Sequence, residues 1–137
     1  MNGITQVKAY RILQAQVAAV VRDYGLGSVS EWFVLSDVYH NKQVIAKDVA
    51  VLLDVEAPLI TRLVNNLLYN DLVQISLHQT DKRIKYISPT RRAAELVPTV
   101  EAALEAVLGK TLTGIRQTEL VSYQKVLETI IKNGESS

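Results

Sequence analysis

Apolar residues recur at intervals of three and four along most of the chain, which is the spacing of one face of an α-helix. This pattern predicts helices over residues 4–24, 30–41, 47–53, 58–69, 90–108 and 117–132. Gly25 and Gly27 end the first helix, because glycine favours helix termination. Ser30 and Thr90 stand where a hydroxyl group would cap the second and the fifth helix. Residues 133–137 are expected to be a disordered tail.

Between the fourth and fifth helices the pattern changes to that of β-strands. Residues 72–77 are rich in β-branched side chains and residues 83–88 alternate apolar with polar ones, so both predict strands, joined by a polar tip at 78–82. Residues 43–45 are expected to be a short connection. The third helix should bury Val49, Ala50, Leu52 and Leu53. A helix-turn-helix followed by such a hairpin is a winged helix, so we expect a mainly α fold with a small β-hairpin wing.

The composition limits the classes of function. A chain of 137 residues with 48% apolar residues is about one domain and can bury its own core. The absence of cysteine excludes disulfide frameworks, thiolate metal sites and cysteine nucleophiles. The longest uncharged run near the N-terminus, Ile12 to Val21, is far too short to cross a membrane, and the first ten residues lack a signal-peptide pattern. The sequence predicts a soluble cytoplasmic protein without a membrane partner.

The charges are unevenly distributed, although the net charge is only +1. Residues 1–55 are neutral, residues 56–92 carry +3 and the remainder carries −2. A basic middle segment is what a local phosphate-binding surface needs. The alternative is a solvated face without a partner, and the charge pattern does not decide between them.

The outward face of the helix predicted over 58–69 lies opposite its apolar residues. It carries Pro58 and the polar residues Thr61, Arg62 and Asn65. Arginine can pair bidentately with guanine or contact a phosphate, and asparagine can pair with adenine. The alternatives are a surface ion pair for Arg62 and simple solvation for Asn65. Lys47, Lys82 and Lys85 are candidates for sequence-independent phosphate contacts.

Catalytic and metal-binding patterns are weak in this sequence. His78 with Asp81, and His40 with Asp37, each stand three residues apart but lack the third ligand that a zinc site needs. Gly25-Leu26-Gly27 lacks the rest of a dinucleotide fingerprint, and no serine lies in a Gly-x-Ser-x-Gly elbow. We therefore expect no enzymatic activity, no bound metal and no cofactor.

The apolar residues of both terminal segments allow two interpretations. They include Val7, Val17, Val21, Leu120, Val126 and Ile130. All of them could belong to the core of one chain. However, helices at opposite ends of a small winged-helix domain have little intrachain core left to join, and packing on a second copy would bury this surface. A homodimer built from the first helix and the last two would also supply the two-fold symmetry of a palindromic DNA site.

Five parts of the chain carry a resemblance to a known family. They are Glu31-Trp32-Phe33-Val34-Leu35, residues 55–67, Leu72-Val73, Asp81-Lys82-Arg83 and Thr90. They resemble the MarR family of winged-helix transcriptional regulators. The first is similar to the opening of the family's second helix, and residues 55–67 are similar to its recognition helix. Leu72-Val73 and Asp81-Lys82-Arg83 are similar to the start of its wing and to its Asp-x-Arg wing motif, and Thr90 to the start of its long dimerisation helix. The ordered combination is more specific than any one of them.

The chain also departs from the MarR pattern at several positions. Asp71 stands where glycine is usual, Pro89 where leucine is usual and Ile75 where arginine is frequent. Small hydroxyl residues are usual where Glu56, Pro58 and Leu59 stand, and an Asp-Arg pair where Asn65-Asn66 stands. The scaffold resemblance survives these changes, whereas a DNA sequence preference does not carry over.

The resemblance implies how the chain is organised and what the wing does. It implies one MarR-like domain over 1–137, with a winged-helix part at about 28–89 and dimerisation helices at about 1–27 and 90–133. It also implies that Arg83 reaches into the DNA minor groove while Asp81 holds it by ion pairing. The alternative is that Asp81 and Arg83 form only a surface salt bridge, worth about 0–1 kcal/mol.

The implied function is a sequence-specific DNA-binding transcriptional regulator, a homodimeric repressor that reads double-stranded DNA at a pseudo-palindromic operator. Members often hold a small aromatic effector between the dimerisation and DNA-binding parts. Residues that could line such a pocket, or be ordinary core, are Tyr10, Trp32 and Tyr39. The alternative is a winged-helix protein–protein interaction module that has lost DNA binding. Glu56 and Ile75 favour that alternative, whereas Arg62 and the Asp-x-Arg motif oppose it.

Overall fold

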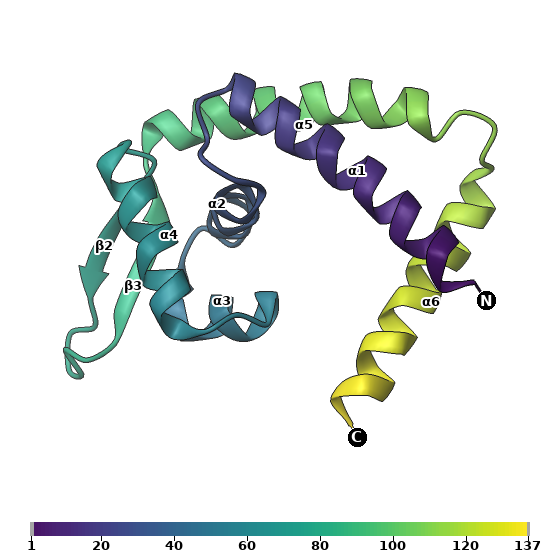
Figure 1. The fold of residues 1–137 in the computed structure, drawn as a ribbon. Helices are drawn as coiled ribbons and strands as arrows, with labels where there is room; N and C mark the ends of the chain where they lie inside the picture. The colour runs from purple at the N-terminus through teal and green to yellow at the C-terminus, as the bar shows by residue number, and fades with distance from the viewer. Residues whose placement is uncertain (1, 137) are drawn as a thin grey trace.

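The computed structural model describes residues 2–136, which form six helices and three strands (Figure 1). The helices are α1 (Gly3–Asp23), α2 (Val29–Asn41), α3 (Ala46–Leu53), α4 (Ala57–Tyr69), α5 (Arg91–Thr111) and α6 (Gln117–Glu135). The strands are β1 (Val44–Ile45), β2 (Val73–Leu77) and β3 (Lys85–Pro89). The predicted mainly α fold with a β-hairpin wing is confirmed.

The hydrophobic core lies around α2, which contacts α1, α4, α5 and the sheet (Figure 1). Fully buried side chains include Leu35 of α2, Ile60 and Leu67 of α4, Ile87 of β3 and Val97 of α5. Burying one such side chain stabilises a fold by about 1.5–3 kcal/mol. The inner face of α4 is therefore fixed on the core, and its other face is directed to solvent.

The sheet contains one strand more than the sequence predicts. Its order is β1-β3-β2, with antiparallel pairing throughout. Val44 is paired with Ile87, so the segment expected to be a connection is an edge strand. Two residues are too few to show the alternation that marks a strand, and this pairing depends on a contact with a distant segment.

Several predicted boundaries are wrong at their ends. Ser28, not Ser30, caps α2, because its Oγ accepts a hydrogen bond of 3.1 Å from the Glu31 N–H. Leu52 is 64% exposed rather than buried. Helix α5 continues to Thr111, and residues 133–135 belong to α6 rather than to a disordered tail. Ser137, the last residue of the expected tail, lies outside the described residues.

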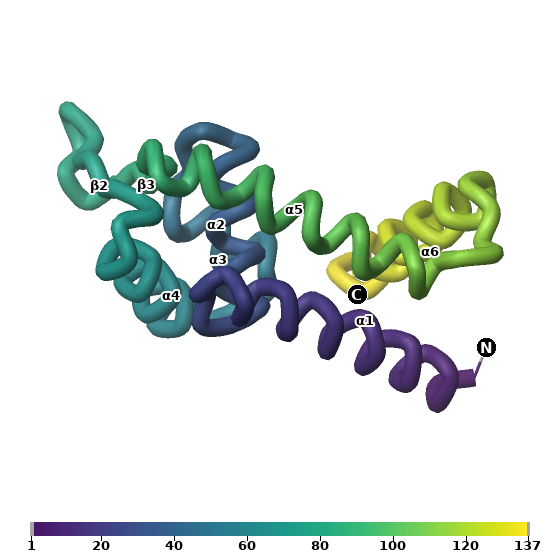
Figure 2. The backbone as a smooth tube through the Cα atoms, turned by 90° about the horizontal axis from the view of Figure 1, so that it is seen from above, coloured from purple at the N-terminus to yellow at the C-terminus, as the bar shows by residue number. Residues whose placement is uncertain are grey.

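Helices α1, α5 and α6 extend beyond the core as an arm. Figure 2 shows α1 and α5 running side by side away from the winged part, and Figure 1 shows α6 turning away from the far end of α5. Val17 and Val21 join the intrachain core, but Val7 is exposed. Of the α6 residues 117–135, none is buried, and Val126 and Ile130 are about half exposed. The intrachain interpretation of the terminal apolar residues therefore holds only for those near the core.

Within residues 2–136, no helix is both long and apolar enough to cross a bilayer.

Candidate nucleic-acid interface

The outward face of α4 presents the residues that the helical spacing predicts there. Pro58, Thr61, Arg62 and Asn65 are all exposed. The Thr61 hydroxyl donates to the Ala57 carbonyl at 3.1 Å. Within the described residues, the side chains of Arg62 and Asn65 make no hydrogen bond or ion pair, so both are free to contact a ligand. Their role in binding DNA stays a prediction.

The wing, which consists of β2, β3 and residues 78–84 between them, carries a closed ion pair at its tip. Arg83 Nε lies 3.0 Å from Asp81 Oδ1, and its NH2 lies 3.1 Å from Oδ2. The Arg83 backbone N–H also donates to Oδ1 at 3.1 Å. These bonds from Arg83 lower the pKa of Asp81 below its usual value. Both carboxylate oxygens of Asp81 thus accept hydrogen bonds from the Arg83 guanidinium group. The Arg83 side chain is 91% exposed, and these bonds limit the directions in which it can point.

His78 closes the wing tip from the other side. Its Nδ1 accepts hydrogen bonds from the backbone N–H groups of Asp81, at 2.9 Å, and Thr80, at 3.2 Å. The Thr80 hydroxyl lies 3.1 Å from the same nitrogen. The spacing of His78 and Asp81 suggested at most a weak metal pair, whereas the structure uses the imidazole to hold the backbone that positions Asp81.

Removal of the imidazole should loosen the wing tip. His78→Ala takes away the acceptor of the two backbone N–H groups, so hydrogen exchange of the Thr80 and Asp81 amides should be faster than in the native protein. In His78→Asn the side-chain oxygen can accept from the same amides, and exchange should stay close to that of the native protein. Equal exchange in the native protein and in His78→Ala would contradict this role of His78.

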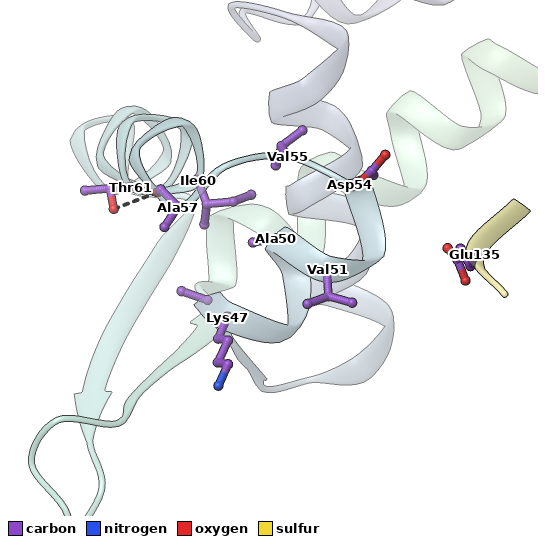
Figure 3. Close-up of a pocket in the computed structure, with 10 residues that line it drawn as sticks. Lys47, Ala50, Val51, Asp54, Val55, Ala57, Ile60, Thr61 and Glu135 are labelled. Atoms are coloured by element: carbon purple, nitrogen blue, oxygen red, sulfur yellow. Dashed lines mark hydrogen bonds between the residues drawn. The ribbon is translucent and has the colours of Figure 1, made fainter. Parts of the chain in front are cut away.

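The three candidate lysines lie on separate elements and are all exposed. Lys82 is in the wing tip and Lys85 is on β3, next to the Asp81–Arg83 pair in sequence. Lys47 is on α3, where it lines a cavity of about 580 Å³ together with Thr61 of α4 (Figure 3). Lys47 and the first turns of α4 thus border one cavity, while Lys82 and Lys85 accompany the wing.

Known proteins match this chain in fold, whereas no sequence family does. No family model matches the sequence, and no curated protein matches it. Among solved structures, the transcriptional regulator PA3341 is 27% identical, with 98% of each chain covered and a TM-score of 0.83. A mutant of MarR from E. coli in complex with operator DNA is 12% identical, with 93% of this chain and 91% of that chain covered and a TM-score of 0.82. The chain has the MarR-family winged-helix fold.

A third structure with the MarR-like fold contains a bound small molecule. CouR from Rhodococcus jostii RHA1, bound to p-coumaroyl-CoA, is 23% identical, with 93% of this chain and 89% of that chain covered and a TM-score of 0.84. The resemblance to the MarR family drawn from sequence motifs is confirmed at the level of the fold.

One departure from the MarR pattern has a local explanation. Asp71, which stands where the family usually has glycine, adopts a left-handed backbone with φ of 57°. Aspartate tolerates this region better than most residues. The turn is also tied to the start of α5, because the Thr90 hydroxyl donates to the Asp71 carbonyl at 2.7 Å and Arg92 donates to the Asn70 carbonyl at 2.9 Å. Sequence analysis missed both bonds, since they join residues about twenty positions apart.

The three candidate pocket residues lie in different surroundings in this MarR-fold chain. Trp32 is buried in the core, Tyr10 is 62% exposed on the arm and Tyr39 is half-buried with its ring edge-on to His40. The two cavities described in the structure are lined by other residues. Trp32 therefore serves as core, and a shared pocket stays a prediction.

His40 and Asp37, the second histidine–aspartate pair, contact other residues rather than each other. His40 Nε2 lies 3.2 Å from Glu101 Oε2 of α5, so it joins two helices, while Asp37 Oδ1 accepts from the Asn41 side chain at 2.9 Å. Within residues 2–136, no three potential metal-binding side chains gather.

Proposed function

We propose that this chain is a sequence-specific DNA-binding transcriptional regulator that acts as a homodimer. In this proposal the outward face of α4 reads the major groove and the wing reaches the minor groove. Two observations on the same chain carry it. The side chains of Arg62 and Asn65 on α4 make no hydrogen bond or ion pair within the described residues, and the wing presents Arg83 held by both carboxylate oxygens of Asp81. A long cation held in this way suits a narrow groove, where negative potential is concentrated.

The structural neighbours support this proposal. PA3341, the neighbour at 27% identity, is described as a transcriptional regulator, and MarR is seen with operator DNA. CouR is seen with p-coumaroyl-CoA, which supports control of this chain by a small aromatic effector. We further propose a cytoplasmic repressor without catalytic activity or cofactor, in which residues 28–89 bind DNA and residues 1–27 and 90–133 form the dimer.

The exposed surface of the single chain supports a dimer. It amounts to 9855 Å², whereas a compact monomer of this mass exposes about 7,100 Å². The excess comes with large apolar side chains on the arm that remain about half exposed or more: Ile4, Val7, Tyr10, Ile12, Tyr123, Val126, Ile130 and Ile131. A second copy that covers these side chains would remove apolar surface from water at about 25 cal/mol per Å².

The dimer gives a direct prediction for the mass in solution. Sedimentation equilibrium at micromolar concentration should yield a species of twice 15.2 kDa. The reason is that the apolar arm, which has no core of its own, is stable when two copies share it. A monomer at that concentration would contradict the dimer and also the argument for a symmetric operator.

Selection of bound duplexes from a random pool tests the proposed function. A dimeric regulator should enrich a pseudo-palindrome whose half-site centres lie about one helical turn, roughly 34 Å, apart. Uniform retention of all sequences would reduce the function to non-specific binding. No retention at low salt would favour the alternative, a protein–protein interaction module that has lost DNA binding.

Arg62 is the residue of α4 for which base reading makes the sharpest prediction. Arg62→Ala should weaken binding to the selected duplex by about 1–3 kcal/mol and relax the preference at one position in each half-site. Arg22→Ala, which removes an equal charge from the end of α1, is the matched control and should leave the preference unchanged. Uniform weakening across all sequences would instead identify Arg62 as a phosphate contact.

A further inference from the structure

A buried carboxylate lies between the first helix and the helix proposed to read DNA. Glu31, in the first turn of α2, is 5% exposed. Among residues 2–136 it is the one charged residue that is buried. Its Oε2 accepts a hydrogen bond of 2.9 Å from the backbone N–H of Gly27, and its Oε1 accepts one of 2.9 Å from the side-chain amide of Asn66 on α4. Both donors are neutral groups.

The fit around this carboxylate is close on the side of Gly27. A Cβ atom at position 27 would lie 2.8 Å from Glu31 Oε1 and 3.1 Å from Oε2, so the loop between α1 and α2 approaches the carboxylate as only glycine can. A buried charge is costly unless its oxygens are hydrogen-bonded. The two bonds meet this requirement, and they join the loop after α1 to α4 through one carboxylate.

We propose that Glu31 is a positioning residue, which fixes the rotation of α4 relative to the end of α1 and thereby the direction of Arg62 and Asn65. The buried apolar residues hold the inner face of α4 on the core, but hydrophobic attraction is non-directional and sets the exact rotation less sharply than a hydrogen bond does. A hydrogen bond is directional and weakens steeply when it is misaligned. Asn66 follows Asn65 in sequence and lies four residues after Arg62, so the bond to Glu31 acts on the same turn of α4 that presents these two side chains.

The same contact couples the dimer arm to the DNA-reading helix. Gly27 lies in the loop that follows α1, and Glu31 joins it to α4 through one carboxylate. A displacement of the end of α1 therefore reaches α4 through two hydrogen bonds. This inference rests on the proposed function for its consequence at DNA, but the coupling itself can be tested without DNA.

A pair of substitutions separates positioning from charge. Asn66→Asp removes the donor to Glu31 and places a second carboxyl group, which has no N–H to donate, against the Glu31 oxygens. The double variant Glu31→Gln/Asn66→Asp restores a donor and an acceptor between the two positions, because the glutamine amide can donate to the new carboxylate while its oxygen accepts from Gly27. The double variant has the net charge of the native protein and keeps a carboxylate at position 66.

The measurement is the ratio of affinities for the selected duplex and for a generic duplex. Asn66→Asp should lower this ratio at least fivefold, and the double variant should restore it to within twofold. A change that only destabilised the fold would lower both affinities together and leave the ratio unchanged, which would overturn the positioning role. Failure of the double variant to restore the ratio would overturn it as well.

Hydrogen exchange keeps the coupling testable if the native protein selects no duplex. Asn66→Asp should speed exchange of the Gly27 amide, because the carboxylate that accepts this N–H is repelled, and the double variant should slow it again. Should Asn66→Asp fail to fold, Asn66→Ala leaves the Gly27 bond in place and should lower the affinity ratio with little effect on Gly27 exchange. Unchanged exchange in Asn66→Asp would overturn the coupling irrespective of DNA binding.

Discussion

Arg83→Ala should weaken binding to the selected duplex by about 1–3 kcal/mol per subunit. The substitution removes the guanidinium group that Asp81 holds out from the wing, and with it the contact proposed for the minor groove. The loss should be greatest on duplexes with A·T-rich flanks, where the minor groove is narrow and its negative potential is highest. Titration of labelled duplexes with A·T-rich and G·C-rich flanks measures both effects.

Asp81→Ala tests the same wing, and here we expect the DNA affinity to change in the direction opposite to that predicted from charge alone. Removing a carboxylate near DNA should strengthen binding if only charge mattered. We expect weaker binding, because Arg83 loses both of the oxygens that fix its direction. Tighter binding at unchanged thermal stability would show that the pair is only a surface salt bridge.

Lys82→Ala is the matched control for these two variants. It removes a neighbouring charge from the wing tip without touching the ion pair. Binding should weaken evenly on all duplexes, and the dependence of log affinity on log salt should flatten by about 0.9 per lost phosphate contact. A preference for particular flanks in Lys82→Ala would contradict its assignment as a phosphate contact.

The lowered pKa of Asp81 fixes the pH range in which the wing pair operates. Because the folded pKa lies below the ordinary value, the interaction is complete above that ordinary value and is lost only as pH falls through the depressed one. The Asp81–Arg83 pair should therefore stay closed between pH 5 and pH 8.

Ile130→Glu should convert the dimer to a monomer and weaken binding to the selected duplex at least a hundredfold. Ile130 is 47% exposed in the single chain, so the substitution spares the intrachain core, but it would place a charge in the proposed dimer interface. Loss of the dimer also separates the two α4 helices that would read neighbouring half-sites. Sedimentation and duplex titration of the same sample measure both consequences.

Thr118→Glu provides the control for this second large effect. It adds the same charge to the opposite side of α6, where the residue is exposed. The dimer should survive in Thr118→Glu. Equal dissociation in both variants would place the dimer contact elsewhere on α6 or attribute the effect to net charge.

The elements with strong periodicity were predictable from sequence. The stripe of Ile60, Leu63 and Leu67 defined α4, and it left Arg62 and Asn65 on the outward face where the structure has them. The Asp-x-Arg motif likewise indicated an ion pair at the wing tip. In both cases the signal is local, because the residues concerned are neighbours on one helix turn or in one hairpin.

Several contacts that the sequence did not predict join distant segments. Strand β1 exists only because Val44 meets Ile87, and the Glu31–Asn66 bond joins residues 35 positions apart. Ser28 and Ser30 are equivalent as cap candidates until the path of the loop after α1 is known. Helical and strand periods contain no information about such pairings, which are set by how the elements pack.

The most direct test of the central claim is sedimentation velocity of a fluorescently labelled selected duplex mixed with the native chain. At low salt the duplex should sediment as a complex with two chains per site, and the same complex should lose affinity steeply as salt is raised, because phosphate contacts release counterions. Arg83→Ala and Ile130→Glu should each reduce the bound fraction at fixed concentration. A duplex that sediments alone at low salt, beside a well-folded dimer of the chain, would contradict the proposal that this protein binds DNA.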